Sequence, residues 1–162
     1  RYRPVTLEKL SLHSGVTECL KRMVNSGDFP HLMLYGPSGA GKKTRVLALL
    51  RELFGSGVEK VNAHLFDGTQ TKVSHKTFKV KSKTIEIATI GSNYHIEINP
   101  SDVGFNDRHV VQEVIKEIAQ THTVTAAQQQ HPFKVVVLNE VDRLSKAAQH
   151  ALRRTMEVYV GT

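Results

Sequence analysis

The chain has little cysteine and no long apolar run, and both shortages narrow the classes of protein it can belong to. Its 162 residues include a single cysteine, Cys19, so it forms no internal disulfide and suits a reducing compartment. No run of about 18 apolar residues occurs, so we expect no membrane span. No secretory signal pattern stands at the beginning. Cys19 lies in an apolar helical pattern, which favours a small buried residue over a reactive thiol.

Acidic residues are too few to balance the basic ones. The formal net charge is +7, and the isoelectric point is near 9.6. This excess permits an acidic partner, such as nucleic acid, a nucleotide or an acidic protein, without choosing among them. The hydrophobic fraction of 40% is enough for a core, and the length suits one domain. Because the first residue is Arg1, we interpret the chain as processed, trimmed or part of a longer one.

Apolar spacing and breaker residues predict helices alternating with strands. Helical periodicity predicts helices at 5–24, 44–55, 107–120 and 145–159, the last with Ser145 as N-cap. Apolar runs or alternation predict strands at 31–36, 58–65, 78–90 (a hairpin around Ser82-Lys83), 94–98 and 133–138. Residues 121–131 are predicted to form a surface loop. Strands separated by helices indicate an α/β domain with a parallel sheet.

A lysine-rich segment runs through the predicted hairpin. It contains Lys72, Lys76, Lys79, Lys81 and Lys83. We favour a solvated edge that discourages unwanted strand pairing, and contact with DNA is the alternative.

The stretch "GPSGAGKKT" at 36–44 resembles a phosphate-binding loop, for which the pattern is G-x-x-x-x-G-K-[ST]. Glycines let several backbone N–H groups approach one phosphate. The following helix directs its positive end at the anion, and the Lys42 ammonium can reach the β/γ oxygens. The residues predicted to hold ATP or ADP are Gly36, Pro37, Ser38, Gly39, Ala40, Gly41, Lys42, Lys43 and Thr44.

Two departures from the usual pattern affect the metal rather than the phosphate. Lys43 stands where a hydroxyl normally ligates Mg²⁺, and Thr44 lies about 100° further round the helix. The strand "VVVLNEVD" at 135–142 usually ends in Asp-Glu, where Asp holds Mg²⁺ and Glu activates water. Here Asn139 replaces the Asp, and Glu140 is the catalytic candidate. Thr44 and Asn139 could hold Mg²⁺ only loosely, so we predict nucleotide binding without useful hydrolysis.

Four segments together resemble replication factor C, the eukaryotic clamp loader. They are "YRP" at 2–4, "FPHLMLYGPSGAGKKTR" at 29–45, "NPSDVGFNDRHVVQEVIKEIA" at 99–119 and "VVVLNEVDRLSKAAQHALRRTMEVY" at 135–159. The resemblance implies a P-loop NTPase fold of the AAA+ class and a nuclear location. It also implies other replication factor C subunits as partners in a hetero-pentamer, together with the PCNA sliding clamp and primer–template DNA in replication and repair.

The resemblance also implies roles for individual residues. Lys43 and Asn139 resemble the branch of the family whose site binds nucleotide but hydrolyses it poorly. Tyr2, Arg3 and Pro4 match the segment that wraps the nucleotide base. Arg108 matches an arginine that contacts DNA phosphate, the alternative being a surface arginine or a pair with Asp107 or Glu113. Arg153 and Arg154 match paired arginines of a subunit interface or of the site itself, the alternative being a helix surface.

Family subunits are longer than this chain, so the resemblance identifies residues 1–162 as the N-terminal portion of an AAA+ nucleotide-binding domain. The sensor strand, arginine finger, lid and collar are then missing. In the family's sheet the missing strand lies between the strands at 31–35 and 134–138. We expect these residues not to be stable alone, with a gap or a non-native neighbour there. The alternatives are an active P-loop NTPase of another class, or a truncated interaction module.

Overall fold

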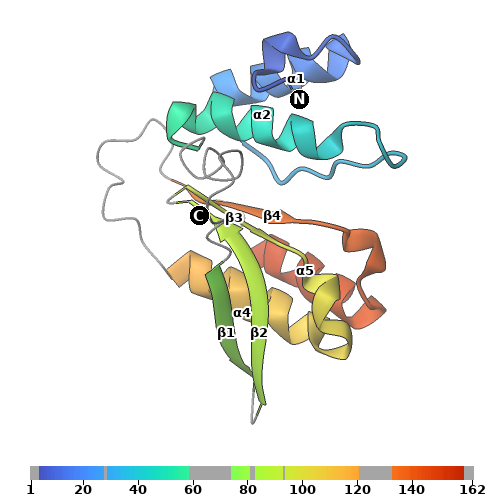
Figure 1. The fold of residues 1–162 in the computed structure, drawn as a ribbon, viewed down its shortest axis with the longest axis vertical. Helices are drawn as coiled ribbons and strands as arrows, with labels where there is room; N and C mark the ends of the chain where they lie inside the picture. Colours follow the sequence, from blue (N-terminus) through green and yellow to red (C-terminus); the bar gives the residue numbers. More distant parts are fainter. Residues whose placement is uncertain are drawn as a thin grey trace, which may run out of the picture. The chain divides into compact units, whose positions relative to one another are not determined.

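A computed structural model describes residues 4–27, 29–58, 74–80, 83–92, 94–120 and 133–158. The chain divides into two compact units, Arg1–Phe66 and Asp67–Thr162, here called the N-terminal unit and the C-terminal unit. Figure 1 shows their elements, and each unit is described by itself. None of the described helices is both long enough and apolar enough to span a membrane.

The N-terminal unit is helical. It contains η1 (Leu7–Lys9), α1 (Ser14–Ser26), α2 (Lys42–Phe54) and η2 (Gly55–Val58). The predicted helix at 5–24 is therefore split at His13, whose backbone is left-handed, whereas the helix predicted at 44–55 is confirmed as α2. The apolar side chains buried in this unit are Leu7, Leu20, Val24, Ala48, Leu49, Leu50, Leu53 and Val58.

The prediction that Cys19 is buried is wrong, because the structure exposes it. The buried residues of α1 are Thr17, Leu20 and Val24, which recur at intervals of three and four. Cys19 lies one position before Leu20, which turns its side chain about 100° away from that face.

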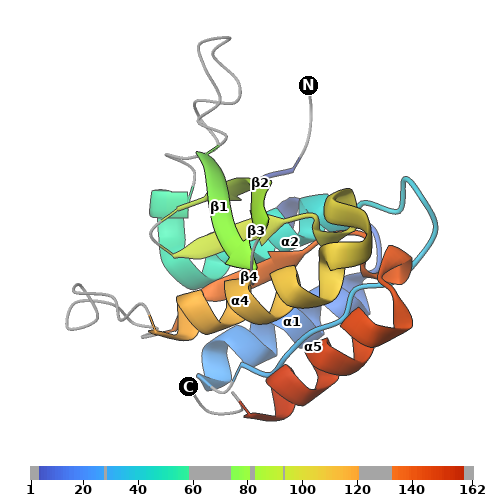
Figure 2. The same ribbon diagram turned by 90° about the horizontal axis from the view of Figure 1, so that it is seen from below.

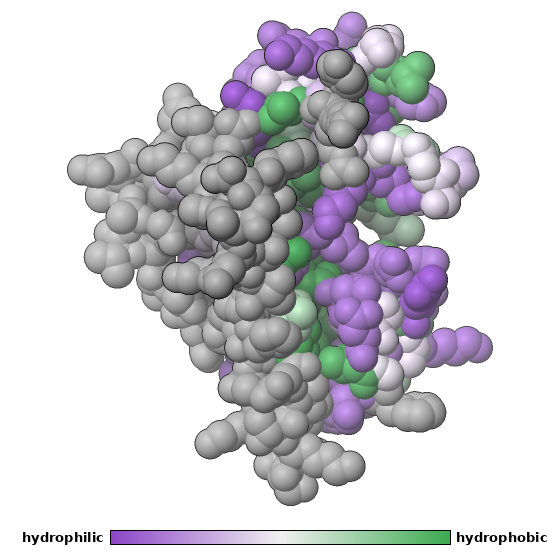
Figure 3. Space-filling model, viewed as in Figure 1, coloured by the Kyte–Doolittle hydropathy of each residue, from purple (hydrophilic) through white to green (hydrophobic). Residues whose placement is uncertain are grey.

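The buried strand predicted at 31–36 is also wrong for the described structure. No strand is assigned there, and Met33 and Tyr35 are 76% and 87% exposed. A strand needs a neighbour that accepts its hydrogen bonds, and no described residue of the N-terminal unit is in a strand. Further exposed apolar residues of the unit are Val5, Leu12, Val16 and Leu32. In Figure 3, patches of hydrophobic surface (green) lie between areas of hydrophilic surface (purple). The predicted gap beside 31–35 stays a prediction.

The C-terminal unit contains a four-stranded sheet in the order β1-β2-β3-β4. Its strands are β1 (Ser74–Val80), β2 (Lys83–Gly91), β3 (His95–Ile98) and β4 (Val135–Leu138). β1 and β2 form the predicted hairpin, with Val80 opposite Lys83. β2 and β3 are antiparallel, whereas β3 and β4 are parallel. The α/β class and parallel pairing are thus confirmed, and the antiparallel pairs make the sheet mixed.

Two helices complete this unit, joined to the strands by short 3₁₀ turns. The elements are η3 (Pro100–Asn106), α4 (Asp107–Gln120), η5 (Val141–Arg143) and α5 (Lys146–Val158). Val110 of α4 packs with Ile87 and Ile98 of the sheet, and Val111 packs with Leu144 and Ala148. These two successive residues of α4 therefore pack into two different hydrophobic clusters, one against the sheet and one against α5. Figure 2 shows α4 between the strands and α5.

A buried carboxylate joins the starts of α4 and α5. Asp107 is 3% exposed, and its oxygens accept hydrogen bonds from the backbone N–H of Arg108 at 2.7 Å and of Ser145 at 2.7 Å. The Ser145 hydroxyl donates to the same carboxylate at 3.0 Å and accepts the backbone N–H of Ala148 at 3.1 Å. Ser145 is thus the predicted N-cap, and one acid fixes both helix beginnings.

Some predicted features fall outside the described residues. They are the strand predicted at 58–65, of which only Val58 is described and ends η2, the loop at 121–131, and Lys72 and Lys81 of the lysine-rich segment. The roles considered for that segment stay predictions.

Candidate functional site

The predicted phosphate-binding loop has a backbone that requires its glycines. Gly36, Gly39 and Gly41 have φ angles of 149°, 80° and 78°, values that side-chain-bearing residues rarely adopt. A Cβ added at Gly39 or Gly41 would meet nothing within 4 Å. Packing therefore does not select glycine at these two positions. The positive φ angles are what require glycine there.

The loop ends at the start of α2. The Ala40 N–H donates to the Pro37 carbonyl at 3.3 Å and closes the turn. Gly41 is the N-cap residue, and no side chain caps the helix. The N–H groups of the first helical turn have no partner within a helix, so they are available to an anion that approaches the N-terminus.

Lys42 lies over the loop itself. Its Nζ donates to the carbonyls of Gly36 at 2.7 Å and Pro37 at 2.9 Å. The ammonium is therefore held beside the same backbone that would surround a phosphate, and phosphate oxygens could replace the two carbonyls as its acceptors. These residues fit the phosphate groups of a nucleotide.

The metal positions fit less well. Lys43, which is exposed, occupies the hydroxyl position, and Thr44 is half-buried one residue later. An ammonium carries the same sign as a metal ion and offers no lone pair to it. Among the described residues, no group of three or more His, Cys, Asp or Glu side chains could hold a metal. The donors present therefore do not fit a tightly held Mg²⁺, although Thr44 retains a hydroxyl.

In the C-terminal unit, Asn139 follows β4, and both its side chain and its backbone N–H form hydrogen bonds to β3. Its Nδ2 donates to Oε1 of Glu97 at 2.7 Å, and its backbone N–H donates to the Ile98 carbonyl at 3.0 Å. Glu97 is 8% exposed and belongs to β3, which pairs with β4. The contact uses the amide donor of Asn139, which an aspartate would lack. Only the neutral amide oxygen is left for a metal-bound water.

Sequence reasoning did not identify Glu97. The available signal was an acidic residue inside the apolar strand "HIEI", because a buried acid needs a partner. The pairing of β3 and β4 supplies Asn139 as that partner. Nearby, burial lowers the pKa of His95 below its ordinary value, and the negative charge of Glu97 partly opposes the shift.

Glu140, the catalytic candidate, has a strained backbone and a partner. Its φ angle is 51°, in the left-handed region that non-glycine residues seldom occupy except where structure or function requires it. Its carboxylate lies 3.1 Å from Nη1 of Arg143, and both side chains are well exposed. The Glu140 carboxylate is thus not buried in an apolar pocket, and it forms an ion pair with the Arg143 guanidinium.

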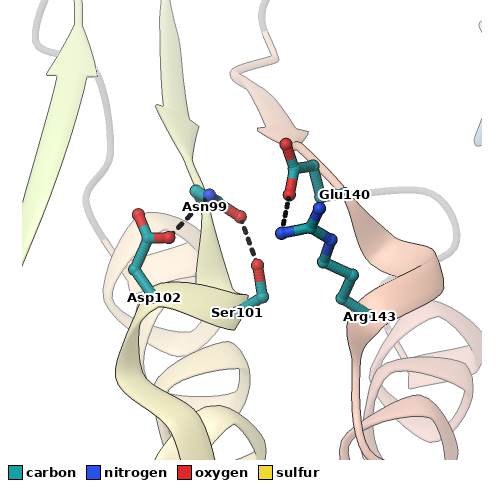
Figure 4. A network of polar contacts seen from close by, with 5 residues as sticks. All are labelled: Asn99, Ser101, Asp102, Glu140 and Arg143. Carbon is teal, nitrogen blue, oxygen red and sulfur yellow. Dashed lines mark hydrogen bonds and ion pairs between the residues drawn. The ribbon is translucent and has the colours of Figure 1, made fainter. Parts of the chain in front are cut away.

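A second polar group lies near the end of β3. Asn99 Nδ2 donates to Asp102 at 2.8 Å, and the Ser101 hydroxyl donates to Asn99 Oδ1 at 2.7 Å. Figure 4 shows this group beside the Glu140–Arg143 pair, past the ends of two neighbouring strands. β3 and β4 are parallel, and the carboxyl ends of parallel strands form the usual ligand-binding edge of an α/β sheet.

The remaining predicted residues lie elsewhere or outside the described part. Arg108, Arg153 and Arg154 are exposed. The Asp107 carboxylate accepts hydrogen bonds from the Arg108 backbone N–H and from Ser145. Tyr2 and Arg3 lie outside the described residues, and Pro4 is half-buried before η1.

Comparison with known proteins gives a family and a set of relatives. Residues 32–160 match the family described as "ATPase family associated with various cellular activities (AAA)". The chain is 52% identical over 163 residues to "Replication factor C subunit 3" of Mus musculus, covering 100% of this chain. It is 52% identical over 161 residues to "Probable replication factor C subunit 3" of Dictyostelium discoideum, covering 98% of this chain.

A plant relative gives the same result. "Replication factor C subunit 5" of Oryza sativa is 50% identical over 163 residues, covering 98% of this chain. The chain spans 43% of the length of each of these three relatives.

Proposed function

This chain belongs to the AAA family of ATPases, and from that premise we propose that it binds ATP or ADP and hydrolyses it slowly or not at all. The observation that carries the proposal is the Lys42 ammonium, held at 2.7 Å and 2.9 Å over the loop carbonyls of Gly36 and Pro37. Lys42 and the uncapped N-terminus of α2 together supply the positive groups that a triphosphate needs. Both are independent of a metal ion.

Slow hydrolysis is supported by the residues that stand at the sequence positions expected to supply metal ligands and the water-activating acid. Phosphoryl transfer depends on a metal that neutralises the developing charge. Lys43 adds a positive charge where a ligand is usual, and Asn139 donates its amide to Glu97. Glu140, which would activate water, is paired with Arg143. Each of these features weakens catalysis without weakening the hold on phosphate.

We further propose that residues 1–162 form the N-terminal portion of the nucleotide-binding domain of a clamp-loader subunit. The relatives are replication factor C subunits, which implies a clamp-loading role in DNA replication. The subunit is of the type called 3 in animals, 3 or 5 in plants and 5 in budding yeast. It works with other replication factor C subunits in a hetero-pentamer, and loads PCNA onto primer–template DNA in the nucleus during replication and repair.

Arg108 is our proposed contact to the DNA phosphate backbone. Its side chain is exposed at the start of α4, and in the described part of the chain it forms no salt bridge. The Asp107 carboxylate accepts its hydrogen bonds from the Arg108 backbone N–H and from Ser145, and not from the Arg108 side chain. A free guanidinium is suited to bidentate binding of phosphate.

The test of slow hydrolysis uses the full-length chain with labelled ATP. We expect ATP to bind, and Glu140→Gln to change single-turnover phosphate release by less than about threefold, because the wild-type rate is already uncatalysed. Asp142→Asn, on the same turn, is the matched control. A drop of more than about tenfold in Glu140→Gln alone would indicate an active NTPase. Failure of the wild type to bind ATP would favour an interaction module.

A further inference from the structure

Glu97 is a buried carboxylate that accepts a hydrogen bond from an amide. It is 8% exposed, and acidic side chains are rarely buried this deeply unless they are paired. A buried negative charge lowers stability unless hydrogen-bond donors or a positive charge compensate it. Nδ2 of Asn139 donates to Glu97 Oε1 at 2.7 Å, which is a short, charge-assisted hydrogen bond. The two residues are here called the Glu97–Asn139 pair.

The Glu97–Asn139 pair joins the carboxyl ends of two parallel strands. Glu97 belongs to β3, and Asn139 comes directly after β4. The backbone N–H of Asn139 donates to the Ile98 carbonyl of β3 at 3.0 Å. Both the main chain and the side chain of Asn139 are therefore bound to β3, at the edge where α/β sheets usually bind their ligands.

The pair also fixes the residue that precedes a strained backbone position. Glu140 has φ and ψ of 51° and 42°, and such a conformation persists in a non-glycine residue where the surrounding structure imposes it. On one side, Asn139 is bound to β3 by two hydrogen bonds. On the other side, the Arg143 N–H donates to the Glu140 carbonyl at 3.0 Å. All of these contacts are made by the chain itself.

An amide at position 139 is a donor where the usual aspartate is only an acceptor. An aspartate would bring two carboxylates within hydrogen-bond distance of each other with no donor between them. A divalent cation is the group that ordinarily joins two buried carboxylates. The N–H of the Asn139 side chain occupies that point instead, so Glu97 is satisfied without a metal.

We propose that the Asn139 amide takes the place of a metal ion as the group that joins Glu97 to the end of β4. This edge of the sheet is then equally ordered with and without Mg²⁺. The inference deepens the proposed function and rests on it, because it names the contact that makes this edge independent of a metal. Glu97 is a positioning residue: it sets the Asn139 side chain and, through it, the backbone of Glu140.

The test is amide hydrogen exchange in the full-length chain without nucleotide, measured in Mg²⁺ and in EDTA. The reporters are the N–H groups of Asn139 and Arg143. The internal reference is the Val135 N–H, which donates to the Tyr94 carbonyl at the other end of β4. In the wild type, we expect Mg²⁺ to change none of the three rates by more than about twofold. Asn139→Asp should speed exchange at both reporters about tenfold in EDTA, the effect of losing a hydrogen bond to a charged group, and Mg²⁺ should reverse most of this change.

Two further variants separate the pair from a general loss of stability. Glu97→Gln combined with Asn139→Asp, here called the exchanged pair, reverses donor and acceptor, because the glutamine amide can donate to the aspartate. It should return both rates in EDTA to within about threefold of the wild type. Asn99→Asp is the matched control. It removes an exposed amide contact to Asp102, directly after β3, and should leave both reporters unchanged.

Unchanged exchange in Asn139→Asp overturns the proposal, and so does a faster rate that Mg²⁺ does not reverse. If Asn139→Asp does not fold by itself, the exchanged pair decides: rates near the wild type support the proposal, and rates about tenfold faster overturn it. Titration of the wild type with ATP tests the proposed function separately. If ATP does not bind, the proposed function fails, while the exchange rates still decide the role of the Glu97–Asn139 pair.

Discussion

Replacing Lys42 with methionine is expected to weaken ATP binding by the full-length chain about a hundredfold. The ammonium already lies at hydrogen-bond distance from two carbonyls of the loop, 2.7 Å and 2.9 Å away. Methionine fills the same space with no charge and no donor. Because the metal positions are poor, no bound cation compensates for the loss. Equilibrium titration with a fluorescent ATP analogue measures the effect.

The neighbouring lysine is the matched control for that experiment. Lys43 is exposed and follows Lys42 directly, so Lys43→Met removes the same charge from the same helix turn. The loop pattern includes Lys43 among the nucleotide-binding residues, but its exposed side chain stands at the metal position, so we expect ATP affinity to change by less than about threefold. Equal losses in the two variants would mean that general positive charge, rather than the placement of Lys42, retains the nucleotide.

Replacing Asp107 with alanine is expected to lower the local stability of α4 and α5 by about 3 kcal/mol. The carboxylate is 3% exposed and accepts three hydrogen bonds, one from Arg108 and two from Ser145. Alanine leaves these donors without an acceptor at the start of two helices. Amide hydrogen exchange within α4 and α5 measures the free energy of opening.

Asp102→Ala is the control for the Asp107 experiment. Asp102 is exposed and accepts one hydrogen bond, from Asn99. We expect its loss to lower the same opening free energy by less than about 1 kcal/mol. If the two variants prove equally mild, the buried carboxylate is not what joins α4 to α5.

Local chemistry could be predicted from the sequence where neighbours along the chain determine it. The glycine positions, the start of α2 and the Ser145 cap depend on residues a few positions apart, and the structure has them as predicted. The hairpin at β1 and β2 is equally local. Its alternation lies within one short segment, so the hairpin itself was predictable, although Lys83, predicted at the turn, begins β2 opposite Val80.

Features that depend on distant partners could not be predicted in this way. An apolar run such as 31–36 forms a strand only beside another strand, and sequence periodicity does not reveal whether one is present. Asn139 and Glu97 are 42 positions apart, so their contact depends on the parallel register of β3 and β4.

The magnesium dependence of ATP affinity tests the central claim most directly. The claim is that backbone amides and Lys42 hold the phosphates while the metal is poorly anchored. We predict that the Kd of the full-length chain for ATP differs by less than about threefold between saturating Mg²⁺ and EDTA. A Kd that tightens tenfold or more when Mg²⁺ is added would show a well-formed metal site, and would contradict the claim.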